Sequence, residues 1–140
     1  IPGVLATTER GEGFHNVIDE IDSIEVVAKQ TANFDRTEGL SVMENILQNH
    51  QDIVAVFAHN DEMALGAIEA LEAQGMLDDV VVVGFDATED ARAAVEEGRM
   101  QATVAQQPKL ISEKAVEAAI EVVAGNPVED FIPVDLELIK

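Results

Sequence analysis

Two continuous apolar runs, residues 53–58 and 80–83, mark the most buried parts of the chain, since neither contains a polar side chain. Runs of this length are typical of strands buried on both faces of a parallel sheet. Shorter apolar runs at 24–28 and 102–105 predict two further strands. Residues 134–138 alternate apolar with acidic side chains, which predicts a half-exposed edge strand.

Between these runs, apolar residues recur at the three- and four-residue spacing of amphipathic helices. Four of the five helices begin near a residue suited to capping: Thr7 or Thr8, Asp35, Asn60 or Asp61, and Thr88. Glu38 follows Asp35 by three residues, which is a capping-box pattern. The predicted helices span 7–20, 35–49, 60–75, 88–98 and 110–124.

Strands that alternate with single helices predict right-handed crossover connections. We therefore expect an α/β fold with a doubly wound, mainly parallel sheet and helices on both of its faces. A domain of this kind normally opens with a strand, whereas here only residues 1–3 precede the first sign of a helix. We expect the chain to be part of a longer protein and to lack the first strand of its sheet.

Composition narrows the possible partners. The chain has 140 residues, of which 47% are hydrophobic, enough for one globular core. Its formal net charge of -20 would repel nucleic acids and anionic lipids. It has no cysteine, no apolar run long enough for a membrane span, and no signal-peptide pattern at its start.

Polar or aromatic residues follow four of the predicted strands, at the point where each strand runs out. In an open parallel sheet the carboxyl ends of the strands lie side by side, and ligands bind in the crevice outside them. We therefore expect a small-molecule site at this edge. The residues in question are Asn33, Phe34, His59, Asn60, Asp61, Phe85, Asp86 and Gln106.

Motifs for catalysis are missing from the sequence. It contains no Gly-x-Ser-x-Gly elbow, no cysteine nucleophile and no histidine pair at metal-ligand spacing. Residues 11–13, Gly-Glu-Gly, lack both the preceding strand and the third glycine of a dinucleotide fingerprint. We therefore expect a binding module with no catalytic residues, no cofactor and no metal.

Five segments resemble, in order and spacing, the C-terminal half of the ribose-binding receptors of the periplasmic binding protein type I family. The segments are 9–14, 32–36, 55–67, 83–86 and 102–108, and the resemblance covers essentially the whole chain. It implies a flavodoxin-like sugar-binding lobe at 1–106, a crossover helix at 107–130 that packs on the other lobe, and a returning edge strand at 131–140.

The resemblance also implies a function. Such receptors are periplasmic, close two lobes on a monosaccharide, here D-ribose, and deliver it to the membrane permease of an ABC importer. Their ligand-binding positions match Arg10, Phe34, Asn60, Phe85, Asp86 and Gln106 of this chain. The residue types suit a sugar, because Arg donates, Asp accepts, amides do both, and aromatic rings stack on C–H surfaces.

Each of these residues also has a structural interpretation. Asn60 could be an ordinary helix cap, Phe34 and Phe85 core residues, Asp86 a turn residue and Arg10 a surface ion-pair partner.

Two other functions stay open at this stage. The family also includes the effector-binding domains of LacI-type transcriptional regulators. An isolated half-domain that binds no sugar is the other alternative, and its exposed edges would favour self-association.

Overall fold

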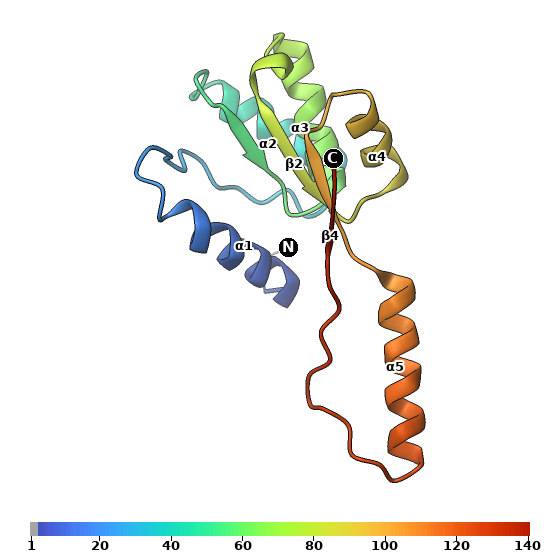
Figure 1. Cartoon of the computed structure of the whole chain (residues 1–140). Helices are drawn as coiled ribbons and strands as arrows, with labels where there is room; N and C mark the ends of the chain where they lie inside the picture. The colour runs from blue at the N-terminus through green and yellow to red at the C-terminus, as the bar shows by residue number, and fades with distance from the viewer. Residues whose placement is uncertain (1–2) are drawn as a thin grey trace.

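The computed structural model describes residues 3–140, which fold around a four-stranded sheet in the order β1-β2-β3-β4 (Figure 1). Strands β1 to β3 run parallel, and β4 is antiparallel to β3. This arrangement confirms the mainly parallel α/β sheet, with the tail as its edge strand. The bounds are β1 (Ala55–Phe57), β2 (Val81–Phe85), β3 (Ala102–Ala105) and β4 (Glu137–Ile139).

Helices connect the strands, and three of the predicted caps are confirmed. Side chains of Asp35, Asn60 and Thr88 each accept a hydrogen bond from the backbone N–H three residues ahead. The first predicted helix is present, but its predicted cap is wrong, because the helix begins at Leu5 and both threonines lie inside it. The helices are α1 (Leu5–Ile18), α2 (Arg36–Leu47), α3 (Asp61–Gln74), η1 (Leu77–Asp79), α4 (Glu89–Glu96) and α5 (Pro108–Val123).

The main core lies on one face of the sheet. Val82 is fully buried among residues of α3 and α4, whereas Val81, its neighbour on the opposite face, is 45% exposed. The opposite face carries α1, whose Phe14 stacks on Phe57 of β1 with ring centroids 5.2 Å apart. Helices therefore lie on both faces, as predicted, although α1 covers its face only in part.

The predicted strand at 24–28 is wrong. Residues in this range belong to no strand, and the segment crosses from α1 toward α2 without joining the sheet (Figure 1). The apolar pattern is real, but a strand exists only when a neighbour supplies ladder hydrogen bonds. No such neighbour lies beside it in the described part of the chain.

Helices α2 and α3 pack with their backbones in contact at two glycines. A Cβ at Gly66 would lie 2.1 Å from the carbonyl oxygen of Arg36 and 2.6 Å from the nitrogen of Leu40. A Cβ at Gly39 would lie 2.9 Å from the backbone of Met63. This close approach fixes the position of α3 relative to α2.

A buried carboxylate joins three elements at the carboxyl edge. Asp61, at the start of α3, is fully buried and accepts hydrogen bonds from the Thr103 hydroxyl at 2.6 Å and the Thr88 N–H at 2.8 Å. The Thr103 hydroxyl in turn accepts from the Ala87 N–H at 3.1 Å. Burial raises the pKa of Asp61 above its ordinary value, against the effect of these hydrogen bonds.

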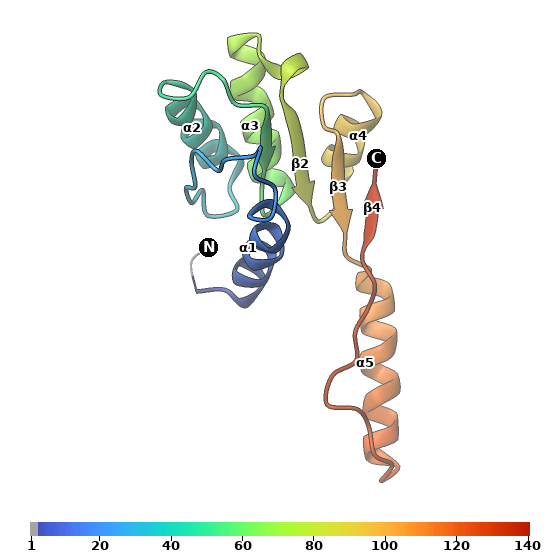
Figure 2. The ribbon, with the colours of Figure 1, turned by 60° about the vertical axis from the view of Figure 1, so that its left-hand side comes forward.

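The C-terminal part extends away from the sheet. Helix α5 projects beyond the carboxyl edge, and the tail returns beside it to form β4 (Figure 2). None of the residues of α5 is buried, and Ile120, Val123 and Phe131 are among the exposed apolar side chains of this arm.

The close contact at Gly66 predicts that adding a single methyl group there destabilises the fold strongly. Gly66→Ala should lower the free energy of unfolding by about 3 kcal/mol or more, because backbone atoms of α2 cannot move aside easily. Gly13→Ala is the matched control, since a Cβ there meets no atom within 4 Å and Ala favours the helix. Urea unfolding of both variants measures the difference, and equal stabilities would contradict the contact.

The raised pKa of Asp61 predicts how the stability of the fold depends on pH. Its native pKa is raised, so native protein holds a proton that the unfolded chain loses above about pH 3.9. The stability contributed by Asp61 is therefore complete below that pH and is lost as the pH rises through the native pKa. Asp61→Asn removes this titration, so its destabilisation should be larger at pH 4 than at pH 8.

The measurement is urea unfolding of the wild type and the Asp61→Asn variant at both pH values. Taking the difference between the two proteins cancels the general repulsion of the acidic surface, which both share. A cost that is equal at the two pH values, or larger at pH 8, would show that the native pKa is not raised.

Candidate functional site

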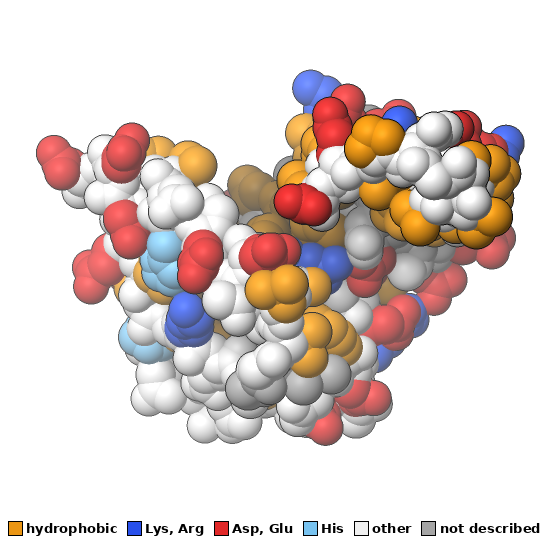
Figure 3. Space-filling view, turned by 90° about the horizontal axis from the view of Figure 1, so that it is seen from below, with side chains coloured by type: hydrophobic (Ala, Val, Ile, Leu, Met, Phe, Trp, Pro, Cys, Tyr) orange, Lys and Arg blue, Asp and Glu red, His pale blue; other side chains and the backbone are white. Residues whose placement is uncertain are grey.

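The carboxyl ends of β1, β2 and β3 meet at one edge of the sheet. The chain passes from β1 into His59 and Asn60, from β2 into Asp86, and from β3 into Gln106. Viewed from below, this part of the molecule is hollowed, with basic side-chain atoms inside the hollow and acidic and apolar ones around it (Figure 3).

Arg10 reaches this edge from α1 and makes three contacts there. Its guanidinium donates to the Asp86 carboxylate at 3.2 Å and to the backbone carbonyl of His59. The same group lies over the Phe85 ring, 3.8 Å from the centroid. The side chain is only 12% exposed, so these contacts fix a cation in a largely desolvated position.

Asp86 is the centre of the cluster. Its Oδ1 accepts hydrogen bonds from both Arg10 and the Gln106 amide, the latter at 2.8 Å. Its Oδ2 has no donor among residues 3–140, and the side chain is 32% exposed. The carboxylate therefore has one oxygen held by the protein and one that can accept from a ligand hydroxyl.

Backbone strain is concentrated near two of the predicted site residues. Among the described residues, the non-glycine positions with positive φ are Asn33, Phe34, Asp86 and Ala87, with φ of 49°, 62°, 112° and 53°. Each such residue costs about 1–3 kcal/mol and persists only where its surroundings hold it. At Asp86 and Ala87 the Thr103 and Asp61 hydrogen bonds supply that support.

Asn60 caps α3 and also borders the cluster. Its amide oxygen accepts from the Met63 N–H at 3.0 Å, so its structural interpretation as a cap is correct. Its amide nitrogen has no acceptor among residues 3–140, although the residue is largely buried. The cap bond holds the Asn60 side chain through its oxygen and leaves the amide nitrogen available as a donor.

The two aromatic residues differ in position. Phe85 is 9% exposed and has one face against Arg10, so it belongs to the cluster. Phe34 is half-buried on the wall of a separate cavity, and no hydrogen bond, ion pair or ring contact joins it to the other five residues in the described structure. The structure thus joins Arg10, Phe85, Asp86 and Gln106 directly, and it places Asn60 next to them in the chain.

Three residues outside the predicted ligand-binding set also shape the site. His59 and Asp61 were expected at this edge without a ligand-binding role, and Thr103 was not expected there. His59 supplies the carbonyl that holds Arg10, and burial, with Arg10 and Lys29 nearby, lowers the pKa of its imidazole. Asp61 and Thr103 hold the strained turn behind Asp86. The available signal for Asp61 was its position just after the apolar run 53–58, where a buried and unpaired carboxylate would be costly.

Hydrogen-bond donors and acceptors, rather than reactive groups, make up this cluster. The edge offers a guanidinium, a carboxylate and two amides beside an aromatic ring, which are groups that pair with hydroxyls. Among residues 3–140 no cluster of histidine and acidic side chains could hold a metal ion.

Comparison with protein families matches residues 1–127 to the family described as periplasmic binding protein domain. The ribose import binding protein RbsB of Bacillus subtilis (strain 168) is 54% identical over 138 residues, which are 99% of this chain and 44% of that protein. The Escherichia coli (strain K12) protein of the same name is 50% identical over 139 residues, 99% of this chain and 46% of that protein. The chain spans about half the length of the curated relatives it matches.

Solved structures agree with the sequence relatives. A periplasmic solute-binding protein of an ABC transporter from Actinobacillus succinogenes 130z, with bound D-allose, superposes with a TM-score of 0.93 at 34% identity. An ABC transporter solute-binding protein from Bacillus halodurans C-125, with bound myo-inositol, gives 0.88 at 47% identity. The match covers 99% of this chain in both cases, and 50% and 48% of those chains.

These relatives are named as binding proteins and not as enzymes, in agreement with the expectation of a binding module. The family match, residues 1–127, includes the helix that provides Arg10 and the strand that Gln106 directly follows. The chain belongs to the periplasmic binding protein domain family.

Proposed function

We propose that this chain is the C-terminal lobe of the solute-binding protein of an ABC sugar importer. In this proposal the complete protein works in the periplasm, binds a monosaccharide between two lobes and delivers it to the membrane permease. D-ribose is the proposed sugar, because the relatives with the highest identities cited above are ribose import binding proteins.

The observation that supports this proposal most is the bond network around Asp86. One oxygen of the carboxylate is held by Arg10 and Gln106, while the other has no donor among residues 3–140. A sugar hydroxyl can donate to that oxygen and accept from Asn60 or from a redirected Gln106 amide. A ligand lacking a matching hydroxyl would leave these partly desolvated groups unpaired, which is costly and gives selectivity.

The exposed arm supports a two-lobed protein. Helix α5 and the tail beyond it present apolar side chains to solvent, including Ile120 and Phe131. A second lobe that packs on this arm would cover them and would enclose the carboxyl edge from the other side. Sugar would then favour the closed arrangement, because only that arrangement lets both lobes bond to it.

The identity of the sugar depends on few groups. Neighbouring structures hold D-allose and myo-inositol, although the same fold surrounds them. Each hydrogen bond to a charged group contributes about 1.5–3 kcal/mol, so one altered residue at this edge changes the preference. The proposal of D-ribose therefore depends on the side chains of both lobes.

Replacing Asp86 tests the proposal. In a two-lobed protein made by joining the N-terminal half of the Bacillus subtilis relative to this chain, Asp86→Ala should weaken D-ribose binding at least about 100-fold. The physical reason is the loss of the acceptor on which the hydroxyl and Arg10 depend. Calorimetric titration gives the affinity, and the melting temperature of the empty protein should change by only a few degrees.

Asp78→Ala is the matched control, since Asp78 is exposed in η1 at the opposite edge of the sheet. This variant should bind D-ribose as the unaltered protein does. Binding by the Asp86→Ala protein within threefold of the control would contradict the role of Asp86. A folded two-lobed protein that binds neither D-ribose nor D-allose would contradict the proposed function.

A further inference from the structure

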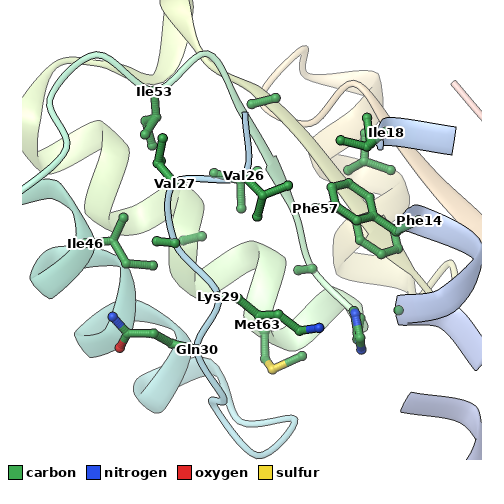
Figure 4. A pocket seen from close by; sticks show the side chains of 18 of the residues that line it. Phe14, Ile18, Val26, Val27, Lys29, Gln30, Ile46, Ile53, Phe57 and Met63 are labelled. Carbon is green, nitrogen blue, oxygen red and sulfur yellow. The ribbon is translucent and has the colours of Figure 1, made fainter. Parts of the chain in front are cut away.

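His59 follows β1 and lies between the carboxyl edge and the cavity shown in Figure 4. Its backbone carbonyl accepts a hydrogen bond from Arg10, while its half-buried side chain lines the cavity. The proposed sugar site uses the carbonyl and gives the imidazole no role. The imidazole is therefore a titratable group, next to two predicted ligand-binding residues, that has no assigned function.

The imidazole packs against α1 at the residue after Arg10. A Cβ at Gly11, which is buried, would lie 3.4 Å from Cε1 and 3.8 Å from Nε2 of the His59 ring. The same ring meets Phe57 with centroids 5.5 Å apart, and Phe57 stacks on Phe14 of α1 (Figure 4). The imidazole thus packs the end of β1 against the turn of α1 that provides Arg10.

The environment of the ring disfavours a positive charge. Burial, together with Arg10 of α1 and Lys29 of the segment before α2, lowers the pKa of His59 below its ordinary value of 6.5. The ring also precedes Asn60, the cap of α3, and the N-terminal end of a helix disfavours a cation. The neutral imidazole is therefore the form that suits this position.

Acidic side chains do not offset these positive charges. Within residues 3–140, no carboxylate forms an ion pair with the His59 ring. The carboxylates of Asp61, Glu62 and Asp86, on neighbouring elements, are bonded to other side chains. The other titratable groups on the cavity wall besides Lys29 are exposed or pair elsewhere, and they are Glu12, His15, Glu25 and Asp52. A proton on His59 would therefore place an uncompensated charge beside Arg10.

We propose that His59, with its imidazole neutral, is a positioning residue for Arg10, and that protonation of the ring releases Arg10 and weakens sugar binding. This inference rests on the proposed function. Contact with Gly11 holds the turn of α1 against β1, from which the guanidinium reaches Asp86. An imidazolium repels the guanidinium and favours separation of α1 from the end of β1. Sugar opposes that separation, because it binds the arrangement in which Arg10 is held.

The direction of the pH effect is opposite to that of Asp61. Because the native pKa of His59 is lowered, the contact is complete above about pH 6.5 and is lost as the pH falls through the native pKa. The contribution of Asp61 is instead lost as the pH rises. Variants of His59 keep Asp61, so comparing them with the wild type isolates the imidazole.

NMR of the Arg10 guanidinium in the sugar-free 140-residue chain tests the positioning role. In the wild type the two Nη nitrogens should give separate signals at pH 7.5, where bonds restrain their rotation, and should merge at pH 5.0. In His59→Gln, whose side chain is neutral at both pH values, they should stay separate. His59→Phe, which keeps a ring against Gly11, should behave as the Gln variant does. His50→Gln is the matched control, since His50 precedes β1 at its other end, and it should follow the wild type.

Sugar affinity provides a second measurement, made by calorimetry on the two-lobed protein described above. Between pH 7.5 and pH 5.0 the affinity for D-ribose should fall at least about threefold in the wild type and in His50→Gln. The fall should be less than half as large in His59→Gln. Comparing two pH values within each protein removes any effect of the substitution on the absolute affinity.

Wild-type Arg10 signals that stay separate at pH 5.0 would overturn the proposal. Variants of His59 that respond to pH as strongly as the wild type, in either measurement, would also overturn it. A two-lobed protein that binds no sugar would contradict the proposed function, whereas the Arg10 signals would still decide whether His59 positions Arg10.

Discussion

The buried carboxylate of Asp61 is the interaction on which the carboxyl edge depends. It accepts from Thr103 of β3 and from the Thr88 N–H at the start of α4, and it belongs to α3. These bonds hold the strained backbone of Asp86, which in turn positions Arg10 and Gln106. A fully buried carboxylate is costly, and its raised pKa records that cost. The Asp86 carboxylate is therefore placed by a second carboxylate, that of Asp61, which is fully buried.

Most of the fold was predictable because its signals are local. Strands β1 and β2 and the caps at Asp35, Asn60 and Thr88 depend on neighbouring residues, and the structure confirms them. The expectation that both strands are buried on both faces is wrong, since Val54 is 71% and Val81 45% exposed. The strand predicted at 24–28 is wrong for the opposite reason. Its apolar pattern is that of a strand, but strand pairing depends on a partner elsewhere in the sheet. The predicted cap at Thr7 or Thr8 is wrong because α1 begins at Leu5, about one turn closer to the N-terminus than these threonines indicate.

The site was predictable only in part. That Arg10, Phe85, Asp86 and Gln106 would meet followed from their resemblance to known receptors and from their positions after parallel strands, and the structure joins them. Phe34 lies away from the other predicted site residues, because its position depends on the segment before α2, which forms no strand. The roles of Asp61 and Thr103 depend on contacts 42 residues apart in sequence, which no pattern along the chain reveals.

The central claim is that this edge of the sheet binds sugar hydroxyls, and NMR titration of the 140-residue chain with D-ribose tests it most directly. One lobe supplies about half of the enclosure, so we expect weak, millimolar binding. The account predicts that the signals of Arg10, Asn60, Asp86 and Gln106 shift with a common dissociation constant, while those of η1 do not. Shifts confined to other surfaces, or unchanged signals at this edge at saturating ribose, would contradict it.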